Sequence, residues 1–245
     1  MKQVWIVSGL VVAAFAVAAL IVGGRDAFTP EEGSGAVTSS GDPNRTATLP
    51  WQIEVLRDGS SVVMGLTLSH DGRGSTLQAA RDQWGEAMQV AIVAAPGEDG
   101  TLEAFVDPAA AGFINGKAVL TAALPADQIK AMRERAIKVD FMESTTRKYT
   151  LAPEDLQAAM QAPLTALSFI PQANLDEATI EARFGKPAER VKRSETVTHH
   201  LYPGKGLDIA LDTKGKELLQ YVPPAWFEQR LRAPLLAASA PSSVQ

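Results

Sequence analysis

The 245-residue chain contains no cysteine, which excludes disulfide bonds, thiol catalysis and thiolate metal sites. This composition fits an oxidising compartment, where stray thiols are a liability, although a cytosolic protein could also lack cysteine. The chain also lacks an excess of basic residues, because its net charge is −5 and its pI is about 5.3. Since nucleic-acid binders need a basic face to displace counterions, we expect no nucleic-acid partner.

Motifs of catalysis and cofactor binding are missing as well. No Gly-x-Ser-x-Gly nucleophile elbow occurs, and the glycine-rich stretch Ser69–Gly74 has neither a Gly-Lys-Ser/Thr end nor Rossmann spacing. His199 and His200 are neighbours in a predicted strand, so their side chains point to opposite faces and cannot bind one metal ion. We predict no catalytic residue, no metal ligand, no cofactor and no small-molecule ligand. The alternative is a hydrolase that uses His70 or the pair His199 and His200.

One long hydrophobic run is present, Val4 to Val22, with 19 residues and no charge. About 20 apolar residues cross the hydrocarbon core of a bilayer, and the run is longer than the apolar region of a typical cleavable signal peptide. We therefore expect a transmembrane anchor over residues 1–24. Lys2 precedes the run while Arg25 is followed by acidic residues, so the positive-inside rule favours a cytoplasmic N-terminus. We expect a single-pass protein of a bacterial inner membrane whose soluble domain lies in the periplasm.

Composition divides the rest of the chain. Residues 25–49 are rich in Gly, Ser, Thr and Pro and are typical of a flexible linker. We expect a first α+β module at 50–124, connecting helices and strands at 125–171, a second module at 172–233 and a fraying tail at 234–245. The connecting segment either bridges the two modules or joins them into one sheet, and the pattern does not decide between these alternatives.

Residues 175–222 contain the clearest pattern of the chain. A short amphipathic helix is predicted from Asp176 to Phe184, with Asn174 or Asp176 as its N-cap and Gly185 as its stop signal. Three alternating strands then follow, separated by two Gly-containing turns. A fainter copy of the same order occupies residues 75–122, where Trp84-Gly85 corresponds to Phe184-Gly185. We therefore expect two tandem units, each a helix with an antiparallel sheet.

The order of motifs in this stretch resembles a known family. A helix, an aromatic-Gly-x-Pro turn, a strand ending in Tyr202-Pro203, and then Gly206-Leu207 leading to Asp212 resemble the SmpA/BamE-like envelope domain. Two such units in tandem are similar to the architecture of beta-lactamase inhibitory proteins. The resemblance implies a non-enzymatic, protein-binding envelope module. Outer-membrane members are acylated on a cysteine after the signal peptide, and this attachment does not carry over because the chain has no cysteine.

These observations together predict a scaffold or accessory subunit of an envelope or inner-membrane complex. We expect it to bind other envelope or inner-membrane proteins, with Tyr202, Tyr221 and Trp226 as candidate contact residues, and to meet the membrane through residues 4–22. The tandem likeness leaves a further alternative, an inhibitor of a periplasmic enzyme. In that case the turn Pro96–Gly100 would enter the active site of the enzyme.

Overall fold

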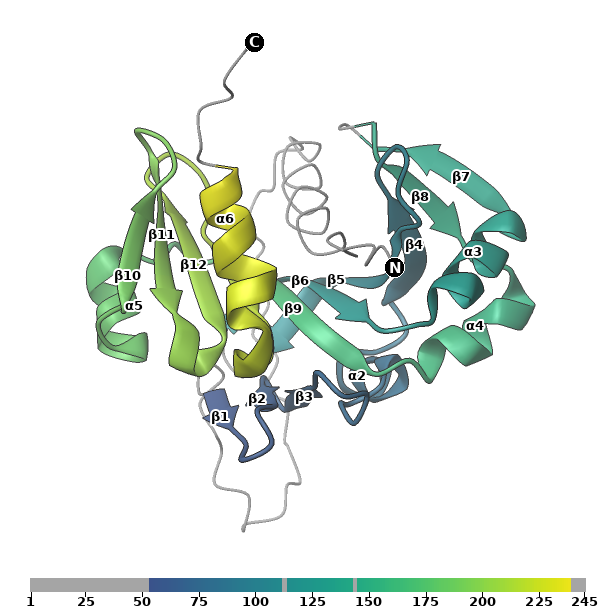
Figure 1. The fold of residues 1–245 in the computed structure, drawn as a ribbon, viewed down its shortest axis with the longest axis horizontal. Coiled ribbons are helices and arrows are strands. Elements are labelled where there is room, and N and C mark those ends of the chain that lie inside the picture. The colour runs from purple at the N-terminus through teal and green to yellow at the C-terminus, as the bar shows by residue number, and fades with distance from the viewer. Residues whose placement is uncertain (1–52, 112–113, 143–144, 239–245) are drawn as a thin grey trace, which may run out of the picture.

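A computed structural model describes residues 53–111, 114–142 and 145–238 (Figure 1). Most of this part of the chain belongs to one antiparallel sheet of ten strands with the order β10-β11-β12-β13-β9-β6-β5-β4-β8-β7. In chain order the strands are β4 (Gln89–Ala94), β5 (Thr101–Ala111), β6 (Ile114–Ala122), β7 (Lys138–Phe141), β8 (Arg147–Thr150), β9 (Leu164–Pro171), β10 (Glu189–Lys192), β11 (Val197–Tyr202), β12 (Leu207–Asp212) and β13 (Leu218–Tyr221).

Strand β9 joins the two halves of this sheet. Phe169 of β9 lies opposite Ala118 of β6 on one side and opposite Leu219 of β13 on the other. Both edges of β9 are therefore paired, and the meander β4–β6 continues into the meander β10–β13 without a break. The expected α+β fold with two tandem BamE-like modules is contradicted: the structure is mainly one large sheet, with a second small sheet and a few short helices.

Four helices pack on one face of the large sheet. They are α2 (Leu77–Trp84), α3 (Ala126–Glu134), α4 (Pro153–Met160) and α5 (Glu177–Phe184). Their buried side chains share a single hydrophobic core with alternate residues of the strands, for example Ile180 of α5 with Ile209 of β12. Because this core extends from β4 to β13, the described residues form one packed unit.

The C-terminal segment covers part of the opposite face. It consists of the 3-10 helix η2 (Pro224–Trp226), the π-helix η3 (Glu228–Arg232) and α6 (Ala233–Ala237). Phe227 and Leu231 pack there against Leu201 and Ala166. In Figure 1 α6 stands beside β12, while α5 lies at the outer edge next to β10. The sheet is thus covered on both faces at this end.

The small sheet consists of β1 (Ile53–Val55), β2 (Ser61–Val63) and β3 (Leu66–Leu68). The sequence predicts a hairpin about Asp58-Gly59, and β1 and β2 confirm it. Residues 62–68 are predicted as a single strand, but Met64 (φ 50°) and Gly65 (φ 81°) turn the chain back, so β3 pairs with β2.

No helix within the described ranges is long and apolar enough to cross a membrane. The run 4–22, on which the predicted transmembrane anchor rests, lies outside the described residues, as does the predicted linker 25–49.

Candidate functional site

Two of the three predicted contact residues lie in the core. Tyr202 is 4% exposed, packs against Phe184 with ring centroids 6.1 Å apart, and donates its hydroxyl to the carbonyl oxygen of Gly185 at 3.0 Å. Tyr221 is 1% exposed, and its buried hydroxyl has no hydrogen-bond partner among the described residues. Burial raises the pKa of Tyr221 well above its ordinary value. Neither side chain can reach a partner protein in this fold.

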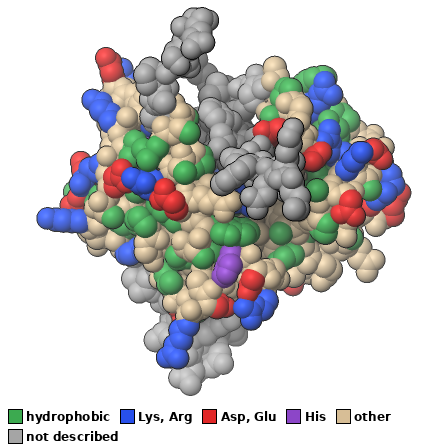
Figure 2. Space-filling view, in the orientation of Figure 1, with side chains coloured by type: hydrophobic (Ala, Val, Ile, Leu, Met, Phe, Trp, Pro, Cys, Tyr) green, Lys and Arg blue, Asp and Glu red, His purple; other side chains and the backbone are tan. Residues whose placement is uncertain are grey.

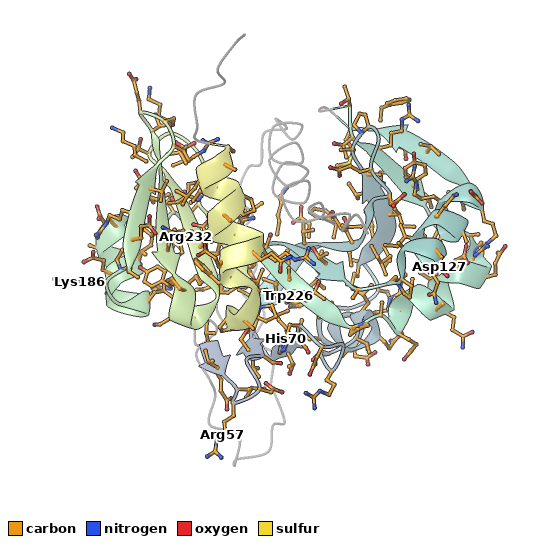
Figure 3. The ribbon with its side chains drawn as sticks, in the orientation of Figure 1. Arg57, His70, Asp127, Lys186, Trp226 and Arg232 are labelled. Atoms are coloured by element: carbon orange, nitrogen blue, oxygen red, sulfur yellow. The ribbon has the colours of Figure 1, made fainter. Side chains whose placement is uncertain are left out.

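The third predicted contact residue, Trp226, is half-buried at a junction of segments. Its ring meets that of His70 edge-on, with centroids 6.3 Å apart, and the guanidinium carbon of Arg230 lies 4.7 Å from the ring centroid. Figure 3 shows His70 and Trp226 side by side, and Figure 2 shows histidine at the same place on the visible surface. Burial lowers the pKa of Arg230, and the cation–π contact partly compensates its charge. The cluster connects the loop after β3 to the C-terminal segment.

The loop around His70 lacks the geometry of a hydrolase. Ser69 donates its hydroxyl to Asp71, and Asp71 also pairs with Arg73. The Nδ1 atom of His70 is buried, and no atom in the described part of the chain forms a hydrogen bond with it. Within the described ranges, therefore, no serine or carboxylate activates His70.

The pair His199 and His200 divides between the two faces of β11, as the alternation predicts. His199 Nδ1 lies 2.8 Å from Oδ2 of Asp208, which is buried on the neighbouring strand β12. His200 is 1% exposed, its Nδ1 has no hydrogen-bond partner, and burial lowers its pKa. No group of His, Asp and Glu among the described residues is arranged to hold a metal ion. His199 is a hydrogen-bond partner of the buried carboxyl group of Asp208, and no serine hydrogen-bonds to His199 in the described part of the chain.

The turn considered for an inhibitory loop is fixed to the body of the protein. Arg133 of α3 donates from Nη1 to the carbonyl oxygens of Glu98 and Asp99, at 2.8 and 2.6 Å. Its guanidinium also lies over the ring of Tyr149, 4.9 Å from the centroid. The turn between β4 and β5 is thus held against α3 by hydrogen bonds to its backbone.

A pocket of about 360 Å³ opens on the face opposite the helices α2 to α5, over the strands β8, β4, β5 and β6. Cross-strand pairing brings its lining together, since Ala91 of β4 lies between Thr150 of β8 and Glu103 of β5. The lining is mainly apolar with a few polar groups, and consists of Gln89, Val90, Ala91, Val93, Glu103, Phe105, Val119, Met142, Lys148 and Thr150.

Glu103 is the buried ionisable group of this pocket. It is 6% exposed, and its Oε1 accepts a hydrogen bond from the hydroxyl of Thr101 at 2.8 Å. Burial raises the pKa of Glu103 to about 7, against a small opposing effect of the Thr101 hydroxyl. Our sequence analysis missed this residue. The sequence does contain a signal for Glu103, because it is the single acidic residue in the otherwise apolar strand Leu102–Val106. Such near-continuous apolar runs are typical of strands that are buried on both faces.

The strand β7 forms one outer edge of the large sheet and carries an apolar row. Ile137, directly before the strand, is 66% exposed, Val139 is 44% exposed and Phe141 is 74% exposed. Val139 and Phe141 alternate along the strand and share one of its sides. No described strand pairs with the outer edge of β7. An exposed apolar row on an unpaired edge is typical of a site where another strand binds.

The other outer edge of the sheet, β10, is charged. Arg190 forms ion pairs with Glu177 and Glu181 of α5, and Glu189 forms one with Arg232 of η3. Charged side chains on an edge strand oppose the addition of another strand. The two ends of the sheet therefore differ in what they can bind.

Comparison of the chain with protein-family models found no match, and comparisons with curated proteins and with solved structures found none either.

Proposed function

We propose that the protein is a non-enzymatic binding module that adds an extended segment of a partner protein to the edge strand β7. The observation that carries this proposal is the row of exposed apolar side chains at Ile137, Val139 and Phe141 on the unpaired edge of a ten-stranded sheet. Among the described residues, no catalytic set is assembled at His70 or at His199, and this supports a binding role over hydrolysis.

The backbone of β7 is suited to strand addition. Met142 donates its N–H to the carbonyl oxygen of Thr146, which turns that residue toward β8. Ile137 also donates its N–H toward β8, to the carbonyl oxygen of Thr150, which lies opposite Lys138, so regular alternation starts at Lys138. Because the direction of N–H groups alternates from Lys138 to Met142, Val139 and Phe141 direct theirs away from β8. A partner strand could bond to these groups while its apolar side chains cover Val139 and Phe141.

The kind of partner follows from the same row. Of the large hydrophobic side chains exposed in the described part of the chain, Val55 and Leu236 stand alone, whereas the other three adjoin each other at β7. An apolar, β-branched or aromatic segment fits this surface better than a charged one. The lack of cysteine supports the prediction that the partners are envelope proteins in the periplasm, because that compartment is oxidising.

Site-specific photo-crosslinking in cells that produce the full chain tests the proposal. A photoreactive residue replaces Val139 or Phe141 on the apolar edge and, as the matched control, Lys192 on the charged edge β10. We expect one partner protein to be crosslinked from the first two positions and not from the third. The same partner from all three positions would contradict docking at β7.

Two substitutions of one residue then separate the backbone from the side chain. Val139→Pro removes an outward N–H and leaves the hydrogen bonds to β8 intact, which an edge strand tolerates. Val139→Thr keeps both the N–H and the β-branched shape. We expect Val139→Pro to abolish crosslinking from Phe141 and Val139→Thr to retain it. Crosslinking that persists with the proline, at an unchanged melting temperature, would exclude strand addition.

A further inference from the structure

The pocket over β8, β4, β5 and β6 has the composition of a ligand site. Its volume of about 360 Å³ falls at the lower end of the range of small-molecule pockets. Phe105, Val119, Val93 and Met142 supply apolar walls. Such walls gain from covering an apolar ligand body of modest size.

Glu103 gives this pocket one chemically distinctive group. Thr101 donates to its Oε1, and within the described ranges no cation forms an ion pair with its carboxyl. A carboxylate can accept about four hydrogen bonds, so most of its capacity is unused. A buried carboxyl group that is ionised without a cation is strongly disfavoured. A ligand with a cationic group would place a positive charge beside this carboxyl group.

Lys148 is the other ionisable residue in the lining, and it does not fill this role. It lies on β8 opposite Val93, whereas Glu103 lies on β5 opposite Ala91, so a strand and two further positions separate them. The neighbouring charges on the same face are paired among themselves, Lys138 with Asp140 on β7. A second such pair joins Lys117 and Asp107 on β6 and β5.

We propose that this pocket binds a small organic molecule with a primary ammonium group on an apolar body, and that the ammonium group contacts Glu103. The ammonium would donate hydrogen bonds to the free positions of the carboxylate, while the body packs between Phe105, Val119 and Met142. This site is separate from the edge strand β7 and does not depend on the function proposed for it.

Phenethylamine and 2-phenylethanol form a suitable pair of probes, because they share one body and differ in the ammonium and the hydroxyl group. Binding to the full chain is measured by ligand-observed NMR and by calorimetry. We expect phenethylamine to bind about 10- to 100-fold more tightly than the alcohol, as for other charge-assisted hydrogen bonds. Its affinity should rise from about pH 5.5 to about pH 8.5 as Glu103 loses its proton.

Glu103→Gln keeps the shape of the side chain and removes its charge, and Glu195→Gln in an exposed loop is the matched control. We expect Glu103→Gln to abolish the preference for the amine and its pH dependence, and Glu195→Gln to leave both unchanged. Melting temperatures show that each variant is folded. Equal binding of the two probes, the same affinity in Glu103→Gln, or no binding of phenethylamine to the wild-type chain would each overturn the proposal.

Discussion

Gly85 and Gly185 end the helices α2 and α5 with nearly identical backbone angles, φ 88° and ψ −177° at the first, and φ 81° and ψ −176° at the second. The helix starts also correspond, because Thr76 and Asp176 each accept a hydrogen bond from the N–H three residues further on. The same capped helix thus occurs twice in the chain, 100 residues apart. This region of backbone angles is accessible essentially to glycine alone.

Replacement of either glycine by alanine should destabilise the fold through the backbone only. A Cβ atom at Gly85 or Gly185 would meet no heavy atom within 4 Å, so no steric clash contributes. We expect each substitution to lower the free energy of unfolding by about 1–3 kcal/mol in urea denaturation. Gly204→Ala is the matched control, since a Cβ there also meets nothing within 4 Å and its φ is not positive. It should be neutral or stabilising by about 0.4–1 kcal/mol, and an equal loss at all three positions would refute the argument.

Local structure was predictable from the sequence because its signals are local. The sequence predicts a helix from Asp176 to Phe184 with Asn174 or Asp176 as N-cap, and α5 confirms it with Asp176 as the cap. It also predicts a helix from Thr76 to Trp84 and a strand from Gln89 to Ala94, which α2 and β4 confirm, with Thr76 as the N-cap of α2. Capping, stop signals and alternation each involve residues close in the chain.

The arrangement of the strands was not predictable in the same way. Alternation shows which residues of a strand share a face, but it does not show which strand lies beside it. The apolar run 164–170 predicts a strand within the connecting segment, and it is the pairing of β9 with both β6 and β13 that joins the two apparent modules into one sheet. Tyr202 is buried for a related reason, because α5 and the C-terminal segment cover both faces of β11.

Gly116 of β6 allows the close approach of β9 that joins the halves. A Cβ atom there would lie 2.3 Å from the carbonyl oxygen of Ile170 and 2.6 Å from a ring carbon of Phe169. Gly116→Ala should therefore destabilise the fold by about 1–3 kcal/mol or more through overpacking. Asn115→Ala is the control, since Asn115 is the exposed neighbour of Gly116 and its replacement should change the stability little. One cooperative transition at a lower urea midpoint is expected, and two separate transitions would argue against a continuous core.

Tyr221 and Tyr202 provide a matched pair for the role of a buried hydroxyl. The hydroxyl of Tyr221 is buried without a partner in the described ranges, whereas that of Tyr202 donates to the carbonyl oxygen of Gly185. Removal of an unsatisfied group relieves its desolvation, so Tyr221→Phe should stabilise the protein by about 1 kcal/mol. Tyr202→Phe should instead destabilise it by about 0.5–1.5 kcal/mol. Thermal melts of the two variants measure the difference, and a loss of stability in Tyr221→Phe would show that its hydroxyl has a partner.

Glu103 should make the stability of the protein depend on pH. Burial raises its pKa from 4.5 to about 7, so the folded protein binds this proton more tightly than the unfolded chain does. The folded state is therefore favoured most below about pH 4.5, where the carboxyl is neutral in both states. As the pH rises from about 4.5 to about 7, the free energy of unfolding falls because Glu103 increasingly favours the unfolded state. Above about pH 7 this loss of stability is constant.

Glu103→Gln stays neutral throughout and isolates that contribution. We expect the variant to match the wild type below about pH 4.5 and to be more stable by up to about 3 kcal/mol above about pH 7. His200 acts in the opposite direction, because burial lowers its pKa and its contribution is lost as the pH falls below 6.5. It is present in both proteins, so it cancels in the difference. Urea denaturation across this pH range measures the effect. If the difference in stability between Glu103→Gln and the wild type does not change with pH, Glu103 keeps an ordinary pKa.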